Sequence, residues 1–157
     1  FATLEFEDAL LFNCLADTFL EDPSGWQPQN MANLLWAYAK LLVTHTQLLD
    51  AMAKEAVATV DNWNFQSLAN VSWAYAKLSC TQHGSFFDRI SAVVVQKISG
   101  FAPQNTVNIA WAFAKLGEAR PGLMDVVAED VIVKAKDYNP QHCSNMAWAF
   151  ATLKVVD

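Results

Sequence analysis

One four-residue motif, Trp-Ala-(Tyr/Phe)-Ala, recurs through this chain at nearly constant spacing. Its four copies begin at Trp36, Trp73, Trp111 and Trp148, which are 37, 38 and 37 residues apart. A period of this length indicates a repeat protein, in which each unit is one supersecondary element that stacks on the next. We therefore expect an array of repeats and not a single domain around one irregular core.

Three further positions keep their residue type relative to this motif. A glutamine stands seven residues before each tryptophan, an asparagine three residues before it, and an aromatic residue ten residues before it. The repeat thus accounts for all six tryptophans, and none of them needs a catalytic role. The glutamines are Gln29, Gln66, Gln104 and Gln141, the asparagines are Asn33, Asn70, Asn108 and Asn145, and the aromatic residues are Trp26, Trp63, Phe101 and Tyr138.

Each repeat is predicted to contain two helices, which we call A and B. Helix A carries the Trp motif, and it often begins with proline, whose missing N–H needs no partner at the first helical position. Asn64 and Asn139 are side chains that cap such a helix well. Helix B has the single apolar stripe of an amphipathic helix. The expected first residues of helix A are Pro28, Phe65, Pro103 and Pro140.

These helices predict an all-α solenoid of about four helix-turn-helix repeats of 37–38 residues. Residues 1–157 are expected to form one array, with a partial repeat at 1–25 and a truncated last repeat. Residues 4–22 match the pattern of helix B, so the chain is expected to be a fragment or a processed chain. The full repeats start near residues 26, 63, 101 and 138.

The composition excludes several classes of protein. With 54% hydrophobic residues the chain is not expected to be disordered, and it has no apolar run of the roughly 18 residues that a membrane span needs. The three cysteines lack metal or redox spacing and the three histidines form no cluster, so no metal is expected. Since no catalytic motif or phosphate loop is present, we expect no enzyme, no cofactor and no small-molecule substrate.

Charge is distributed unevenly between the two kinds of helix. The net charge is −6, yet all sixteen acidic residues lie outside the helix-A segments 28–41, 65–78, 103–116 and 140–154. Each of these segments contains one lysine, namely Lys40, Lys77, Lys115 and Lys154. A lysine near a helix C-terminus complements the helix dipole, and it can equally contact phosphate.

Helix A is apolar over more than half of its circumference and is therefore expected to be buried on most sides. A narrow polar stripe remains, and stacking of the repeats would join the four stripes into one ladder. In the first repeat the stripe is Asn30, Asn33, Ala37 and Lys40. The candidate binding residues of the whole ladder are Asn30, Asn33, Lys40, Ser67, Asn70, Lys77, Asn105, Asn108, Lys115, His142 and Asn145.

The positions of this ladder allow more than one interpretation. The invariant asparagines could bond the backbone of the next repeat inside the structure, or they could face a ligand. The variable position three residues earlier (Asn30, Ser67, Asn105, His142) is better suited to discriminate bases, although a solvated first-turn residue would look the same. We expect the motif tryptophans to fill the gap between repeats, with base stacking as the alternative.

The stretch PQNMANLLWAYAKL at residues 28–41, with copies at 66–78, 103–116 and 140–153, resembles the octotricopeptide repeat family and the related repeats of RAP-domain and FAST-kinase-like proteins. The resemblance covers nearly the whole chain. It implies a right-handed α-solenoid and a soluble or peripheral protein of chloroplasts or mitochondria that binds organellar RNA to control its processing, stability or translation.

The sequence therefore predicts a non-catalytic binding module. We expect it to bind single-stranded RNA through the helix-A ladder, where the variable position contacts bases and Lys40, Lys77 and Lys115 lie near phosphates. The alternative is a protein–protein scaffold, a structural subunit of a large organellar assembly such as a ribosome or photosynthetic complex, that uses the same face or the acidic helix-B surface. Repeat solenoids serve both purposes.

Overall fold

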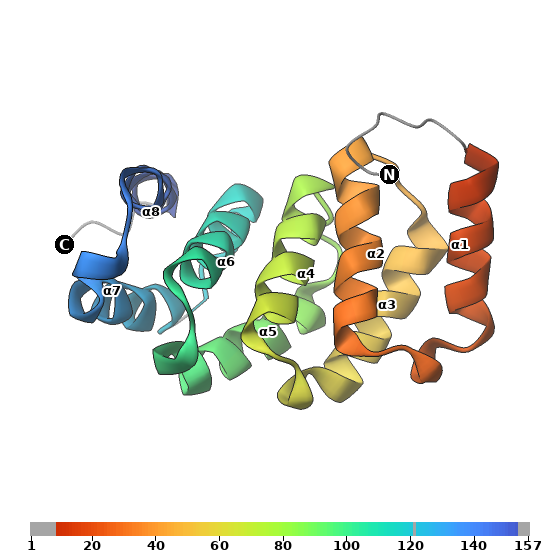
Figure 1. The fold of residues 1–157 in the computed structure, drawn as a ribbon, viewed down its shortest axis with the longest axis horizontal. Helices are drawn as coiled ribbons and strands as arrows, with labels where there is room; N and C mark the ends of the chain where they lie inside the picture. Colours follow the sequence, from red (N-terminus) through yellow and green to blue (C-terminus); the bar gives the residue numbers. More distant parts are fainter. Residues whose placement is uncertain (1–8, 121, 154–157) are drawn as a thin grey trace.

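The computed structural model describes residues 9–120 and 122–153, and the regular structure in these residues is entirely helical. Helices A and B alternate, and short 3-10 turns precede each helix A (Figure 1). The helices are α1 (Ala9–Glu21), α2 (Pro28–Leu41), α3 (Thr46–Thr59), α4 (Phe65–Lys77), α5 (Gly84–Lys97), α6 (Pro103–Leu116), α7 (Leu123–Val133) and α8 (Pro140–Leu153).

The all-α repeat fold predicted from the sequence is confirmed, and so are all four starts of helix A: α2, α4, α6 and α8 begin at the expected residues. Asn64 caps α4 by accepting a hydrogen bond from the N–H of Ser67 at 2.8 Å, and Asn139 accepts one from the N–H of His142 at 2.8 Å. The first helix begins at Ala9, and the part of its prediction before that residue lies outside the described residues. The right-handed sense of the array remains a prediction.

Helix A ends in the same way in three repeats. A residue just after the helix adopts a left-handed backbone conformation. It is the first residue after α2 and α6, Leu42 (φ 56°) and Gly117 (φ 69°), and the second residue after α4, Ser79 (φ 56°). The next N–H then reaches back five residues; the N–H of Val43, for example, bonds the carbonyl of Tyr38 at 2.9 Å. This Schellman-type turn satisfies the last carbonyls of the helix.

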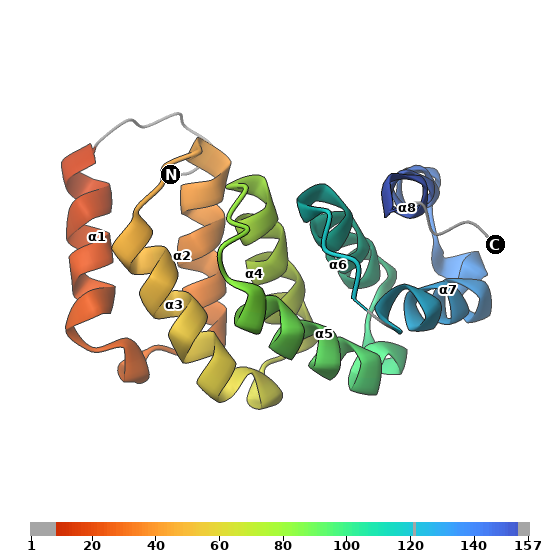
Figure 2. The same ribbon diagram turned by 180° about the vertical axis from the view of Figure 1, so that it is seen from behind.

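The helices form two layers. The A helices α2, α4, α6 and α8 lie side by side in one layer, and the B helices α1, α3, α5 and α7 form the other (Figures 1 and 2). Neighbouring A helices pack more closely than neighbouring B helices do. Alanines such as Ala74 and Ala112, both 0% exposed, allow this close approach. The A helices therefore form the inner layer of the curved array.

The aromatic residue of each motif joins the two layers. Tyr38 and Tyr75 are completely buried, and their hydroxyls donate to carbonyls of the preceding helix B, that of Tyr75 to Leu49 at 2.6 Å and that of Tyr38 to Phe12. In the third repeat Phe113 takes this position and meets the ring of Phe87 edge-on, with centroids 5.7 Å apart. The motif thus fixes each helix A to the helix B before it.

These buried hydroxyls predict a loss of stability at alkaline pH. Burial raises the pKa of Tyr38 to about 12 and raises that of Tyr75 well above its ordinary value of 10. Between these values the unfolded chain releases protons that the folded chain keeps, so folding stability is complete below pH 10 and falls as the pH rises toward 12. Urea unfolding from pH 8 to 11.5 should show this fall.

The double variant Tyr38→Phe, Tyr75→Phe is the control for this pH dependence. Each substitution removes one hydrogen bond, which costs about 1 kcal/mol at neutral pH. The variant should nevertheless lose less stability between pH 10 and 11.5 than the original chain does. Equal alkaline losses in the two proteins would show that these two tyrosines are not the cause. The effect would then belong to other groups whose pKa burial raises, namely Tyr138 and Cys80.

Candidate nucleic-acid interface

Four residues of each helix A share one face at spacings of four, three and four residues, which places them in a single stripe along the helix. The stripe runs Gln, Asn, Trp, Lys, and we call it the QNWK stripe. Its members are Gln29, Asn33, Trp36 and Lys40 in α2, Gln66, Asn70, Trp73 and Lys77 in α4, Gln104, Asn108, Trp111 and Lys115 in α6, and Gln141, Asn145 and Trp148 in α8.

All of these side chains are at least partly open to solvent. The four glutamines and Lys40, Lys77 and Lys115 are exposed, and the asparagines are exposed or half-buried. The alternative of a fully buried asparagine ladder is therefore wrong. Gln104 donates to Asn108 at 2.9 Å in the same helix, so neighbouring amides of the stripe bond one another. Lys154 lies outside the described residues.

The motif tryptophans form a ladder across the layer. The ring centroids of Trp73 and Trp111 are 6.3 Å apart, and those of Trp111 and Trp148 are also 6.3 Å apart, with interplanar angles of 30° and 29°. The indoles thus lie between neighbouring A helices, as expected, but they are not enclosed: Trp36, Trp73 and Trp111 are half-buried and Trp148 is 44% exposed. The polar face therefore contains accessible aromatic rings, which sequence reasoning did not place there.

The variable position predicted to read bases is not uniformly accessible. Asn30 is exposed and Asn105 and His142 are half-buried, but Ser67 is only 2% exposed. The inclusion of Ser67 in an open ladder is therefore wrong. This position points toward the preceding helix A, and the close packing of α2 on α4 covers it.

His142 links two repeats at this position. One nitrogen of its ring lies 3.1 Å from the side-chain oxygen of Gln104, which is 38 residues earlier in the chain. The first turns of α8 and α6 are therefore joined by a polar contact at the edge of the stripe. Sequence reasoning grouped His142 with the base-reading residues; the structure gives it a neighbour within the chain.

The lysines of the A helices have no acidic residue in the same helix. In residues 9–120 and 122–153 the ion pairs lie on the B helices and the connections, for example between Arg120 and Asp88 at 2.7 Å and between Lys134 and Asp130 at 2.6 Å. Arg89 pairs with Asp61 in the same layer. The helix-A segments carry four lysines and no acidic residue, so the remaining six basic and sixteen acidic residues give the other segments a formal charge of −10. Lysines are the only charged residues of the QNWK stripe.

The sequence profile of one family, described as RNA-editing substrate-binding complex 6 protein, matches residues 1–157. The chain belongs to this family. No curated protein matches the sequence closely enough to count as a relative. Membership in the RNA-editing substrate-binding complex 6 protein family confirms an RNA-associated helical protein, whereas the likeness to octotricopeptide repeats stays a resemblance.

The four glutamines were noted as a repeated position in the sequence but were not included among the candidate binding residues. Gln29, Gln66, Gln104 and Gln141 recur in every repeat, and all four are exposed. Their invariance was the available signal, because an exposed residue with no packing role has little structural reason to recur.

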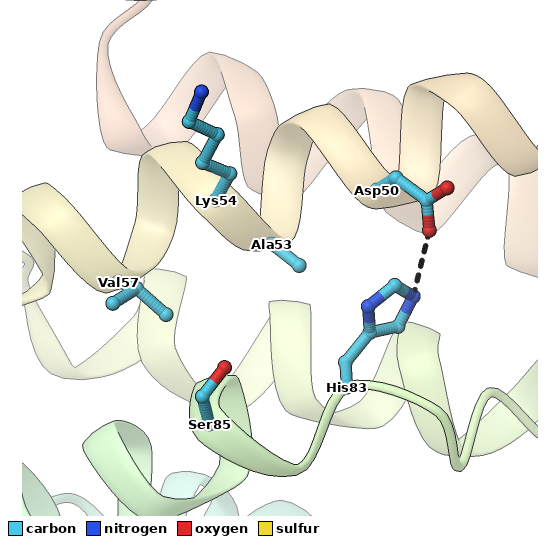
Figure 3. Close-up of a pocket in the computed structure, with 6 residues that line it drawn as sticks. All are labelled: Asp50, Ala53, Lys54, Val57, His83 and Ser85. Carbon is cyan, nitrogen blue, oxygen red and sulfur yellow. Dashed lines mark ion pairs between the residues drawn. The ribbon is translucent and has the colours of Figure 1, made fainter.

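A separate hollow of about 270 Å³ lies in the outer layer between α3 and the start of α5 (Figure 3). His83 extends toward Asp50, and Ser85 and Lys54 lie to one side of this pair, with Lys54 extending away from it (Figure 3). The nearest nitrogen of His83 is 3.6 Å from the Asp50 carboxylate. Burial lowers the pKa of His83, and the carboxylate only partly opposes this. The neutral imidazole is thus favoured, as in a packing contact between repeats.

None of the helices described here is both long and apolar enough to cross a membrane. The prediction that the protein is not an enzyme stays a prediction.

Proposed function

We propose that this protein is a non-catalytic binding module that holds single-stranded RNA along the QNWK stripe as part of an RNA-editing complex. The observation that carries the proposal is the repetition of one solvent-accessible set of amides, indoles and a lysine on successive A helices. The family description names an RNA-editing substrate-binding complex, which supports the same class of ligand.

Each residue type of the stripe suits a single strand. Amide side chains donate and accept hydrogen bonds, as base edges and sugars require. Indoles provide stacking surfaces that accept every base, and Trp148 is the most open of the ladder at 44%. Lys40, Lys77 and Lys115 are placed to contact phosphates. An organellar location, as the resemblance implies, belongs to this proposal as well.

The test compares two sets of lysine variants. Lys40, Lys77 and Lys115 are changed together to Gln, and binding of a fluorescein-labelled single-stranded RNA of mixed sequence is followed by anisotropy at several salt concentrations. Since each phosphate contact contributes about −0.7 to the salt slope for a single strand, the slope should become less steep by about 2. Affinity at low salt should fall as well.

The matched control changes Lys54 and Lys136, which are exposed lysines of the outer side, to Gln. This variant loses two positive charges, against three in the stripe variant, and should change the log–log salt slope by about 0.5 or less. Equal weakening by both sets would show that total charge and not the stripe controls binding. Failure of the original chain to bind any RNA would reject the proposal.

The second candidate function is a protein–protein scaffold, and the acidic outer layer favours it. All sixteen acidic residues lie outside the helix-A segments. In the described residues they lie on the B helices and the connections, where a basic protein partner would find its complement. The scaffold predicts that the protein remains with its complex after nuclease treatment. The RNA proposal predicts release.

A further inference from the structure

His142 forms a capping box with Asn139 at the start of α8. The Asn139 side chain accepts a hydrogen bond from the His142 N–H at 2.8 Å, and the Asn139 N–H donates back to Nδ1 of the His142 ring at 3.4 Å. A main-chain N–H can only donate, so Nδ1 must accept and carries no proton in the neutral ring. The proton of the neutral imidazole therefore lies on Nε2.

The Nε2–H of His142 begins a directed chain of hydrogen bonds that continues on α6. Gln104 presents its side-chain oxygen to Nε2 at 3.1 Å. Its amide nitrogen therefore faces the other way and donates to the side-chain oxygen of Asn108 at 2.9 Å. The Asn139 amide nitrogen also lies 3.4 Å from Nε2, but both nitrogens then carry hydrogen, and the Gln104 oxygen is the nearer acceptor. The direction of each bond thus follows from one main-chain N–H that cannot be reversed.

Asn108 is the last member of this chain of bonds. Its side-chain oxygen is engaged by Gln104, while in residues 9–120 and 122–153 its amide nitrogen bonds no other group. Asn108 is half-buried and lies one turn before Trp111 in the QNWK stripe. A base that stacks on the open edge of this indole would therefore have its own edge beside the N–H groups of Asn108.

The two preceding repeats have a shorter residue at the position of His142. Ser67 and Asn105 take this place in α4 and α6, and in the described part of the chain neither bonds the glutamine of the preceding helix A. The asparagines of those stripes can therefore rotate and can both donate and accept. An asparagine of this kind recognises adenine by accepting from its N6 amino group and donating to its N7. Asn108 is prevented from doing so.

We propose that Asn108 selects the keto bases uracil and guanine over the amino bases cytosine and adenine, and that His142 is the positioning residue that imposes this choice through Gln104. This inference rests on the proposed function, because it concerns RNA held along the QNWK stripe. A side chain that presents only N–H groups bonds the exocyclic carbonyl oxygen of a keto base. An exocyclic amino group would place donor against donor and leave both unpaired.

The test compares labelled oligouridine and oligocytidine of equal length at mildly alkaline pH, because these two bases have the same size and differ at the exocyclic group. One hydrogen bond corresponds to about a fivefold change in affinity, so the original chain should bind oligouridine about fivefold more tightly. Asn108→Ala should abolish this preference. Asn33→Ala, the matched control in α2, should weaken the binding of both RNAs and keep the preference.

Two substitutions of His142 separate its positioning role from its role in the cap. His142→Ala allows Gln104 and then Asn108 to reverse, so the preference for oligouridine should disappear while oligocytidine is bound at least as tightly as before. His142→Gln should keep the preference, because glutamine at the third helical position completes the same capping box and its NH2 can donate to Gln104. Circular dichroism verifies that each variant is folded.

The outcomes distinguish this inference from the proposed function. Equal affinity of the original chain for the two RNAs would overturn the inference and leave the proposed function intact. An unchanged preference in His142→Ala or in Asn108→Ala would overturn it as well. If the original chain binds neither RNA, the proposed function fails and this inference fails with it.

Discussion

Replacing Phe113 with alanine is expected to lower the free energy of unfolding by about 3–5 kcal/mol, the usual cost of removing a large aromatic side chain from a core. Phe113 is 0% exposed and joins the two layers through its contact with Phe87. The cavity would lie where α6 meets α5, in the middle of the array, so neighbouring repeats on both sides limit its collapse. Urea unfolding followed by circular dichroism measures the loss.

The repeat itself supplies the control for this substitution. Tyrosine occupies the same position in the first two repeats, where its hydroxyl bonds a carbonyl of the preceding helix B. Tyr38 and Tyr75 bond the carbonyl 26 residues earlier, which by repeat register is that of Phe87 for position 113. Phe113→Tyr should therefore cost less than about 1.5 kcal/mol. A Phe113→Tyr variant as unstable as Phe113→Ala would show that the repeats are not interchangeable at this position.

Replacing Lys134 with methionine should be the second large perturbation, at about 2–3 kcal/mol, because it leaves a buried carboxylate without its counter-charge. Asp130 is 6% exposed, and the Lys134 ammonium lies 2.6 Å from it. The same ammonium donates to the carbonyl of Phe101 at 2.8 Å, while Thr106 donates to the Asp130 carboxylate at 3.3 Å. These contacts tie the end of α7 to the start of α6.

Lys136→Met is the matched control, since Lys136 is exposed and the charge change is identical; it should alter stability by about 0.5 kcal/mol or less. The double variant Asp130→Asn, Lys134→Met should recover part of the loss, because the uncompensated charge is then removed. If Lys134→Met and Lys136→Met lower the free energy of unfolding equally, the pair of Asp130 and Lys134 does not stabilise the fold.

The parts of the fold that depend on local chemistry could be predicted from the sequence. Pro28, Pro103 and Pro140 mark helix starts because of a property of the proline residue itself, and Asn64 caps its helix through a contact three residues away. Periodicity likewise indicated the two-helix repeat. In these cases the residue and its partner lie within one turn of chain.

The parts of the candidate interface that depend on helix spacing could not be predicted. Ser67 is buried because α2 packs closely on α4, and a helical-wheel argument on one helix contains no information about its neighbour. The accessible edges of the indoles depend in the same way on the distance between A helices, as the 6.3 Å between Trp73 and Trp111 shows. Lys134 was unremarkable in the sequence because its partners lie up to 36 residues away.

The A helices pack in the order α2–α4–α6–α8, and their extensive contacts are those between adjacent members. Loss of α8 removes one such contact and leaves the packing of α2 on α4 intact. Unfolding of residues 1–157 should therefore proceed stepwise along the array. Amide hydrogens should exchange more slowly in α4 and α6, which pack on two neighbouring A helices, than in α2 and α8, which pack on one, and different probes should report different midpoints.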